Sequence, residues 1–150
     1  MNRRYAWTFT CLLAVASCEG DDSQCGAACI GNVSLRLHKV QWDDGLHELI
    51  VRYPRYDGMH EVRCSFELPS TGTETRCEGD GEGNDPQWVH ISVDATVNVH
   101  LGNIQRGDIE IEAVPPEGEA HAELVRPAYT EHEICGQVCV SASEIVDLDD

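Results

Sequence analysis

Apolar and polar residues alternate with a period of two through most of the chain after residue 31. The clearest case is the run from Val89 to Leu101, where every second residue is apolar and those between are polar. Successive side chains of a β-strand point to opposite faces, so this run predicts one buried and one exposed face. It is much longer than a usual strand. We therefore expect two strands, or one strand that bends near residues 94–96 and passes from one sheet to another.

Shorter segments show the same alternation and are separated by residues that favour turns. Turns are predicted at 43–45, 57–58 and 115–118, which are rich in Asp, Gly and Pro. The remaining strands are expected at 33–37, 49–53, 62–68, 109–113, 120–124 and 138–142, followed by a frayed acidic tail from 147 to 150. Seven or eight short strands without a helical period predict an all-β fold, an antiparallel β-sandwich. The strand number also allows an immunoglobulin-like arrangement, although the cysteine and tryptophan pattern of antibody domains is absent.

The first 17 residues have a different character. Arg3 and Arg4 precede an apolar stretch over 6–15, and small residues lead into Cys18. This order is typical of a secretory signal peptide, and the apolar part is too short to span a bilayer. The alternative is cleavage after Ala16, which would release a soluble protein.

The segment Val15-Ala16-Ser17-Cys18 resembles the lipobox of bacterial lipoproteins. The resemblance implies cleavage before Cys18, lipid on that cysteine, and an extracytoplasmic protein anchored to a bacterial membrane, with the outer membrane favoured over the inner. The domains would then be a signal peptide (1–17), a lipid anchor with an acidic tether (18–31) and the β-sandwich (32–150). This layout, with paired cysteines near both ends, also resembles small uncharacterised bacterial lipoproteins, which implies no particular activity.

The cysteine count agrees with a lipid on Cys18. Of the eight cysteines, Cys11 leaves with the leader, and lipidation of Cys18 leaves an even number that can pair fully. Export favours disulfides, and the first predicted pair is Cys64–Cys77. If the first and last strands run parallel, which we favour, the others are Cys25–Cys135 and Cys29–Cys139. If those strands are antiparallel, the pairs are Cys25–Cys139 and Cys29–Cys135, and a four-cysteine zinc site is the remaining alternative.

The charge of the chain restricts its partners. The formal net charge is −17, and Lys39 is the only lysine. A surface this acidic repels phosphate groups, so we expect no nucleic-acid binding and contact with a membrane only through the lipid on Cys18.

Candidate metal ligands are present, but their spacing matches no standard site. Asp80, Glu82, Asn84 and Asp85 form an oxygen-rich loop that lacks the spacing of an EF-hand, so they are weak calcium candidates. His38, His90, His100 and His121 take polar positions of their strands and could meet across strands to bind a transition metal, although surface histidines are the expected outcome. His47-Glu48 lacks the second histidine of a zincin.

No sequence motif identifies a catalytic centre. A G-x-S-x-G serine elbow is absent. Trp42 and Trp88 could stack on a sugar or contact a protein, but packing at a sandwich edge is the expected role. We therefore expect a non-catalytic, lipid-anchored binding or structural module with no cofactor and with a protein or glycan partner. The alternatives are a metal-dependent hydrolase or a calcium-binding surface protein. A cleft that gathers His90 or His100 with acidic residues would favour the hydrolase, and a flat polar sheet would favour the module.

Overall fold

A computed structural model describes residues 31–39, 42–69, 75–79, 89–93, 96–134 and 136–149. Within these ranges the chain forms ten strands and no helix, so no helix there could cross a membrane. The strands are β1 (Asn32–His38), β2 (Gly45–Arg55), β3 (Gly58–Leu68), β4 (Arg76–Gly79), β5 (Val89–Val93), β6 (Val97–Gly102), β7 (Ile109–Val114), β8 (His121–Val125), β9 (Thr130–Ile134) and β10 (Gln137–Asp147).

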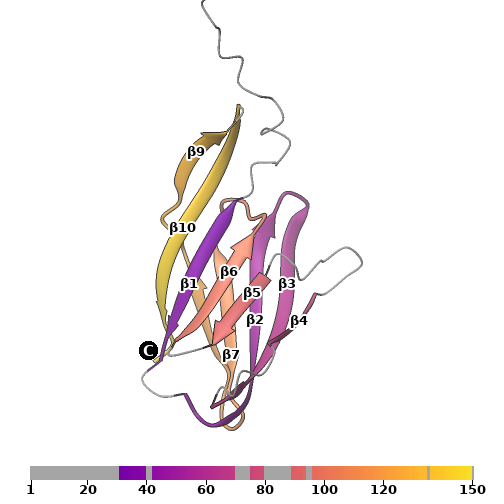
Figure 1. Cartoon of the computed structure of the whole chain (residues 1–150), viewed down its shortest axis with the longest axis vertical. Helices are drawn as coiled ribbons and strands as arrows, with labels where there is room; N and C mark the ends of the chain where they lie inside the picture. The colour runs from indigo at the N-terminus through magenta and orange to yellow at the C-terminus, as the bar shows by residue number, and fades with distance from the viewer. Residues whose placement is uncertain are drawn as a thin grey trace, which may run out of the picture.

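The ten strands form two five-stranded sheets that lie over one another (Figure 1). Sheet A has the order β5-β6-β1-β10-β9, and sheet B has the order β4-β3-β2-β7-β8. All pairings are antiparallel except that between β1 and β10. The predicted all-β antiparallel sandwich is thus confirmed, with one parallel pair of strands.

The core lies between the sheets and consists of the apolar positions of the alternating segments. Val33, Leu35 and Leu37 of β1 are at most 1% exposed. They share one buried cluster with the inward-facing residues of β2 and β7, among them Leu49, Val51, Tyr53, Ile109 and Ile111. Full burial of each Val, Leu or Ile contributes about 1.5–3 kcal/mol. The outer faces of both sheets carry mostly polar and charged side chains, with exposed apolar exceptions such as Leu46 and Ile145.

The long alternating run around residues 89–101 forms two strands, as one of the two alternatives predicted. β5 and β6 pair antiparallel, with Val89 opposite Leu101 and Val93 opposite Val97. Both strands belong to sheet A, so the run does not pass from one sheet to the other. The chain turns back on itself, and the apolar residues of both strands reach the same core.

Two strands were missed by the prediction. β4 is four residues long, and β9 reads Thr-Glu-His-Glu-Ile, so neither shows a clear apolar alternation. Both are edge strands. A strand at the edge needs only one partner and little apolar surface, so its sequence carries a weak signal.

The chain's first and last strands run side by side in parallel at the centre of sheet A. Their register runs from Asn32 opposite Ser141 to His38 opposite Asp147. Beyond the ladder, the backbone N–H of Leu148 donates to the carbonyl oxygen of His38 at 2.9 Å, and Leu148 is 4% exposed. The prediction of a frayed tail from residue 147 is therefore wrong for 147–149, because Leu148 anchors this segment in the core. Figure 1 shows the C-terminal end beside the end of β1.

Candidate functional site

The outer face of sheet B carries a cluster of arginine and glutamate side chains, which we call the arginine–glutamate cluster. Its members come from β2, β3 and β7 and are Arg52, Arg63, Glu48, Glu61, Glu110 and Glu112. Arg52 lies on the central strand and donates to Glu61 and Glu110 at 2.6 Å each and to Glu112 at 3.3 Å. One guanidinium thus joins three neighbouring strands.

Hydrogen bonds within the cluster favour the ionised forms of its side chains. Hydrogen bonds from Arg52 and then Arg63 lower the pKa of Glu61, and the bond to Glu61 raises the pKa of both arginines. Beneath these side chains lies Ile50, an outward-facing residue that is only 5% exposed. A carboxylate held ionised in this way is a poor general acid. The cluster is therefore best suited to joining strands.

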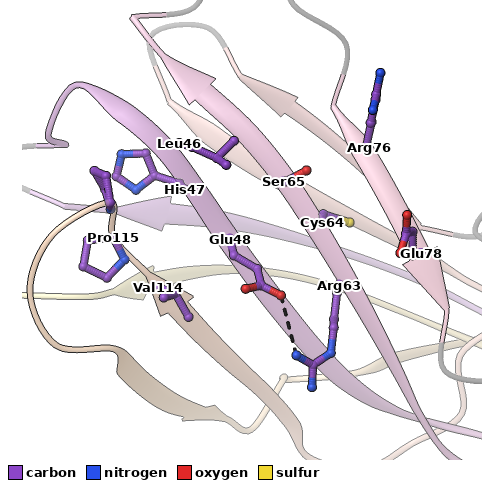
Figure 2. Close-up of a pocket in the computed structure, with 11 residues that line it drawn as sticks. Leu46, His47, Glu48, Arg63, Cys64, Ser65, Arg76, Glu78, Val114 and Pro115 are labelled. Atoms are coloured by element: carbon purple, nitrogen blue, oxygen red, sulfur yellow. Dashed lines mark ion pairs between the residues drawn. The ribbon is translucent and has the colours of Figure 1, made fainter.

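The same sheet face is hollowed beside the cluster into an open groove of about 560 Å³. Figure 2 shows the ion pair between Glu48 and Arg63, 3.6 Å apart, near the middle of this groove. β4 contributes Arg76 and Glu78, and the groove also borders Leu46, which is 63% exposed. The other lining residues are His47, Cys64, Ser65, Val114, Pro115 and Pro116. Charges of both signs beside exposed apolar carbon suit a protein segment better than a small apolar ligand.

The outer face of sheet A carries four of the seven histidines, and we call it the histidine face: His38, His90, His100 and His132. His90 and His100 lie opposite each other on β5 and β6, with stacked rings whose centroids are 6.3 Å apart. His100 Nδ1 lies 2.9 Å from Ser34 Oγ. Ser141 Oγ lies 2.8 Å from His132 Nε2.

His100 borders a pocket of about 360 Å³ that is also lined by Ser34, Arg36 and Glu144, so one carboxylate accompanies it there and not a group of acidic residues. Among the residues that the structure describes, the contacts of His90 and His100 are with each other and with a serine hydroxyl. The predicted polar position of these two histidines is confirmed, since both are exposed. This face is neither the flat polar sheet nor the acidic cleft considered from sequence, because a pocket and the exposed Ile145 interrupt it.

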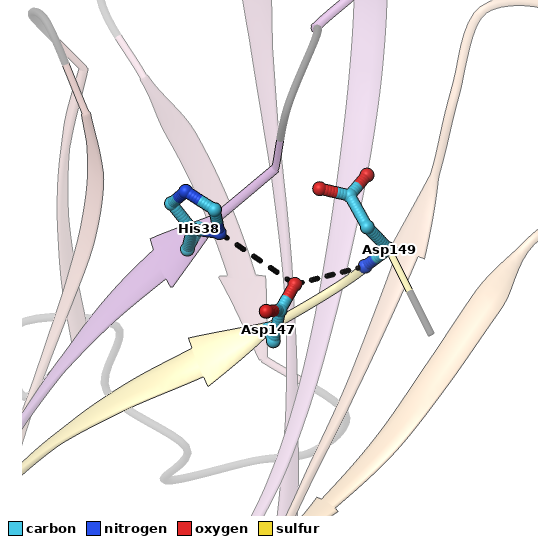
Figure 3. Close-up of side chains that lie close together, drawn as sticks. All are labelled: His38, Asp147 and Asp149. Atoms are coloured by element: carbon cyan, nitrogen blue, oxygen red, sulfur yellow. Dashed lines mark hydrogen bonds and ion pairs between the residues drawn. The ribbon is translucent and has the colours of Figure 1, made fainter.

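One mixed cluster of possible metal ligands lies at the end of β1 and β10. It consists of His38, Asp147 and Asp149, all exposed, whose ligand atoms lie within 4.8 Å of one another. His38 Nδ1 is 3.6 Å from Asp147 Oδ1. Figure 3 shows Asp147 between the other two side chains. Sequence reasoning placed His38 on a polar face but missed both aspartates, because it assigned them to a frayed tail.

The predicted disulfide between Cys64 and Cys77 is present, joining opposite positions of β3 and β4. Cys139 is also disulfide-bonded. That bond is incompatible with a site in which four free thiolates, including Cys139, bind zinc. Cys25, Cys29 and Cys135 lie outside the described residues. Their pairing stays a prediction, and the parallel arrangement of β1 and β10 meets the condition for Cys25–Cys135 and Cys29–Cys139.

The lipid site and the calcium candidates also lie outside the described residues: Cys18, Asp80, Glu82, Asn84 and Asp85, together with Trp88.

Trp42 and His47 have structural roles. Trp42 packs edge-on against Phe66 and His47, as expected for a tryptophan at the sandwich edge. His47 is 2% exposed, stacks on Phe66, and its Nε2 lies 2.8 Å from the Asp43 carbonyl oxygen. His47 borders the groove, but its ring is enclosed and its Nε2 is already hydrogen-bonded to the Asp43 carbonyl oxygen.

Searches among protein families, curated proteins and solved structures found nothing that matches this chain.

Proposed function

We propose that this protein is a lipid-anchored, non-catalytic binding module of the bacterial cell envelope. The anchor would be lipid on Cys18, in the lipobox-like segment Val15-Ala16-Ser17-Cys18. The disulfides at Cys64–Cys77 and Cys139 are in keeping with an oxidising, extracytoplasmic location. The strong negative charge gives the domain no affinity of its own for an anionic surface, so the lipid would supply the attachment.

The observation that carries the binding role is the mutual pairing of ionisable side chains on the two outer faces. Arg52 is shared by three glutamates, and His100 contacts His90 and Ser34. Groups paired in this way form stable, polar contact surfaces. A hydrolase instead needs a nucleophile, a base and a stabilising group directed at one point, and the described residues do not converge in that manner.

We place the partner at the groove beside the arginine–glutamate cluster, and we propose that it is a protein. Exposed Leu46 lines this groove together with Arg63 and Arg76, and apolar and arginine side chains are contacts that protein interfaces favour. Of the two tryptophans that could stack on a sugar, Trp42 packs against the core instead, and Trp88 lies outside the described residues. The mixed apolar and charged lining of the groove is what favours a protein over a glycan.

The anchor is tested by changing Cys18→Ser in the whole chain. In cells given a labelled fatty acid, the unchanged protein should incorporate the label and sediment with membranes. The variant should lose the label and appear in the soluble fraction. Unchanged protein that begins at Ser17 and carries no lipid would contradict the anchor.

The binding role is tested separately by photocrosslinking in the cell envelope. A photoreactive residue at Leu46 should yield a discrete protein adduct. One at Leu124, which is exposed on β8 but does not line the groove, should not. The same adducts from both positions, or none from Leu46, would contradict a binding site in the groove.

A further inference from the structure

The parallel pairing of β1 and β10 brings three possible metal ligands to one end of sheet A. His38 ends β1 and lies directly opposite Asp147, which ends β10, so both side chains leave the same face of the sheet. The Leu148 N–H bonds to the His38 carbonyl, and the Leu148 side chain is buried. This fixes the backbone beyond β10 and sets the place of Asp149, whose N–H lies 3.2 Å from Asp147 Oδ1.

The spacing of the ligand atoms is close to what a bound ion requires. Two ligands, each roughly 2.1 Å from a tetrahedral ion, lie about 3.4 Å from each other. His38 Nδ1 and Asp147 Oδ1 are 3.6 Å apart, and all three ligand atoms lie within 4.8 Å of one another. These exposed side chains can therefore close around an ion by rotation, while the backbone stays in its present place.

The ligand types indicate which ions fit. One imidazole with two carboxylates suits Zn²⁺ and neighbouring transition metals. Ca²⁺ and Mg²⁺ prefer oxygen ligands and gain little from an imidazole nitrogen. The net charge of −17 draws cations toward the surface.

We propose that His38, Asp147 and Asp149 form a binding site for one divalent transition-metal ion, of which Zn²⁺ is the representative. The three side chains supply three ligands, and water completes the coordination because the site is open. Binding on the solvent side makes the ion exchangeable. The inference does not depend on the proposed groove partner or on the lipid.

The test is titration of the purified whole protein, in detergent where it carries lipid, with Zn²⁺ by isothermal calorimetry. The unchanged protein should bind Zn²⁺ at this site, and His38→Ala should weaken that binding at least about tenfold, because loss of even an outer-shell partner of a ligand costs that much. Asp147→Asn and Asp149→Asn should weaken it in the same way. His132→Ala, on the same sheet face but remote from the cluster, is the matched control and should bind like the unchanged protein. Co²⁺ absorption reports whether an imidazole and carboxylates coordinate the ion.

Each outcome decides the proposal. Loss of binding in the three cluster variants, with His132→Ala unaffected and all variants unfolding at the temperature of the unchanged protein, supports it. Binding that survives in His38→Ala but disappears in His90→Ala or His100→Ala would place the ion at the stacked histidine pair and overturn it. No Zn²⁺ binding, or equal binding of Ca²⁺ that none of these variants changes, would also overturn it.

Discussion

The Arg52 guanidinium donates through Nε to Oε2 of Glu61 at 2.6 Å, directly across the pairing of β2 and β3. The other side of the same guanidinium reaches β7 through Glu110 and Glu112. Arg52 therefore joins the three central strands of sheet B on the outer face of the sheet, which the core does not contact. Charge-assisted hydrogen bonds of this kind are stronger than neutral ones.

Replacing Arg52→Met should lower the free energy of unfolding by about 1–3 kcal/mol, because it removes several charge-assisted hydrogen bonds and leaves neighbouring glutamates unpaired. Arg52→Lys should recover only part of the loss, since an ammonium cannot reproduce the planar fork. Urea unfolding at neutral pH measures both variants.

The control is Arg126→Met, whose side chain is 75% exposed and lies 3.5 Å from Asp108. That change should alter stability by no more than about 0.5 kcal/mol. Equal losses for Arg52→Met and Arg126→Met would show that the cluster adds nothing beyond an ordinary surface ion pair.

The lowered pKa of Glu61 predicts a dependence of stability on acid. Its folded pKa lies below the ordinary value of 4.5, so its contribution is present above that value and is lost as the pH falls through the folded pKa. Glu61→Gln should therefore cost about 1 kcal/mol at neutral pH. The difference from the unchanged protein should disappear in strong acid, where both side chains are neutral. A difference that stays constant from neutral pH into strong acid would rule out the ionised carboxylate as its source.

The Cys64–Cys77 disulfide joins positions 13 residues apart. In the chain-entropy account a loop of this size contributes about 3 kcal/mol. Replacing both cysteines by alanine should lower the unfolding free energy by up to that amount while the sandwich still forms. Thermal unfolding followed by circular dichroism checks this, and an unchanged melting temperature would contradict it.

The terminal cysteines should matter more than this pair. A link from the N-terminal segment to Cys135 or Cys139 closes roughly a hundred residues and contributes about 4–5 kcal/mol. Because the two predicted terminal links close nearly the same loop, replacing Cys135 and Cys139 together by serine should lower stability more than Cys77→Ser does. Alkylation under denaturing, non-reducing conditions should detect no free thiol in the lipidated chain, and peptide mapping should recover Cys29 linked to Cys139. Four free thiols, or Cys139 linked to Cys135, would contradict the predicted framework.

Gly31 precedes β1 at a place where no side chain fits. A Cβ there would lie 2.1 Å from the backbone oxygen of Ile104, whose N–H lies 3.3 Å from the Gly31 oxygen. Gly31→Ala should destabilise the fold by about 1–3 kcal/mol through this clash. Asn32→Ala, at the exposed next position, serves as the control. A loss in Gly31→Ala no greater than in Asn32→Ala would mean that the backbone there moves freely.

Local patterning was sufficient to predict most strands and the faces of their residues. Val33, Leu35 and Leu37 are buried, and Ser34, Arg36 and His38 point away from the core, because the period of a strand sorts side chains without reference to its neighbours. The Cys64–Cys77 disulfide could also be predicted from local sequence, since both residues lie close together along the chain. Edge strands β4 and β9 could not be predicted, because their short or polar sequences lack the two-residue alternation of apolar and polar positions.

The sequence by itself determined most of the residues that face the core, where the chain turns and that two sheets pack together. It was wrong for β8, where His121 lies opposite the inward-facing Ala113 and not on the polar face, and Leu124 is 48% exposed. The sequence could not determine which strands become neighbours, because many strand orders bury the same apolar faces. The tertiary structure decided that β1 lies parallel to β10, and this pairing alone brings His38 to Asp147 and anchors Leu148. It likewise placed Arg52 between Glu61 and Glu110, residues far apart along the chain whose approach depends on the order of β3, β2 and β7.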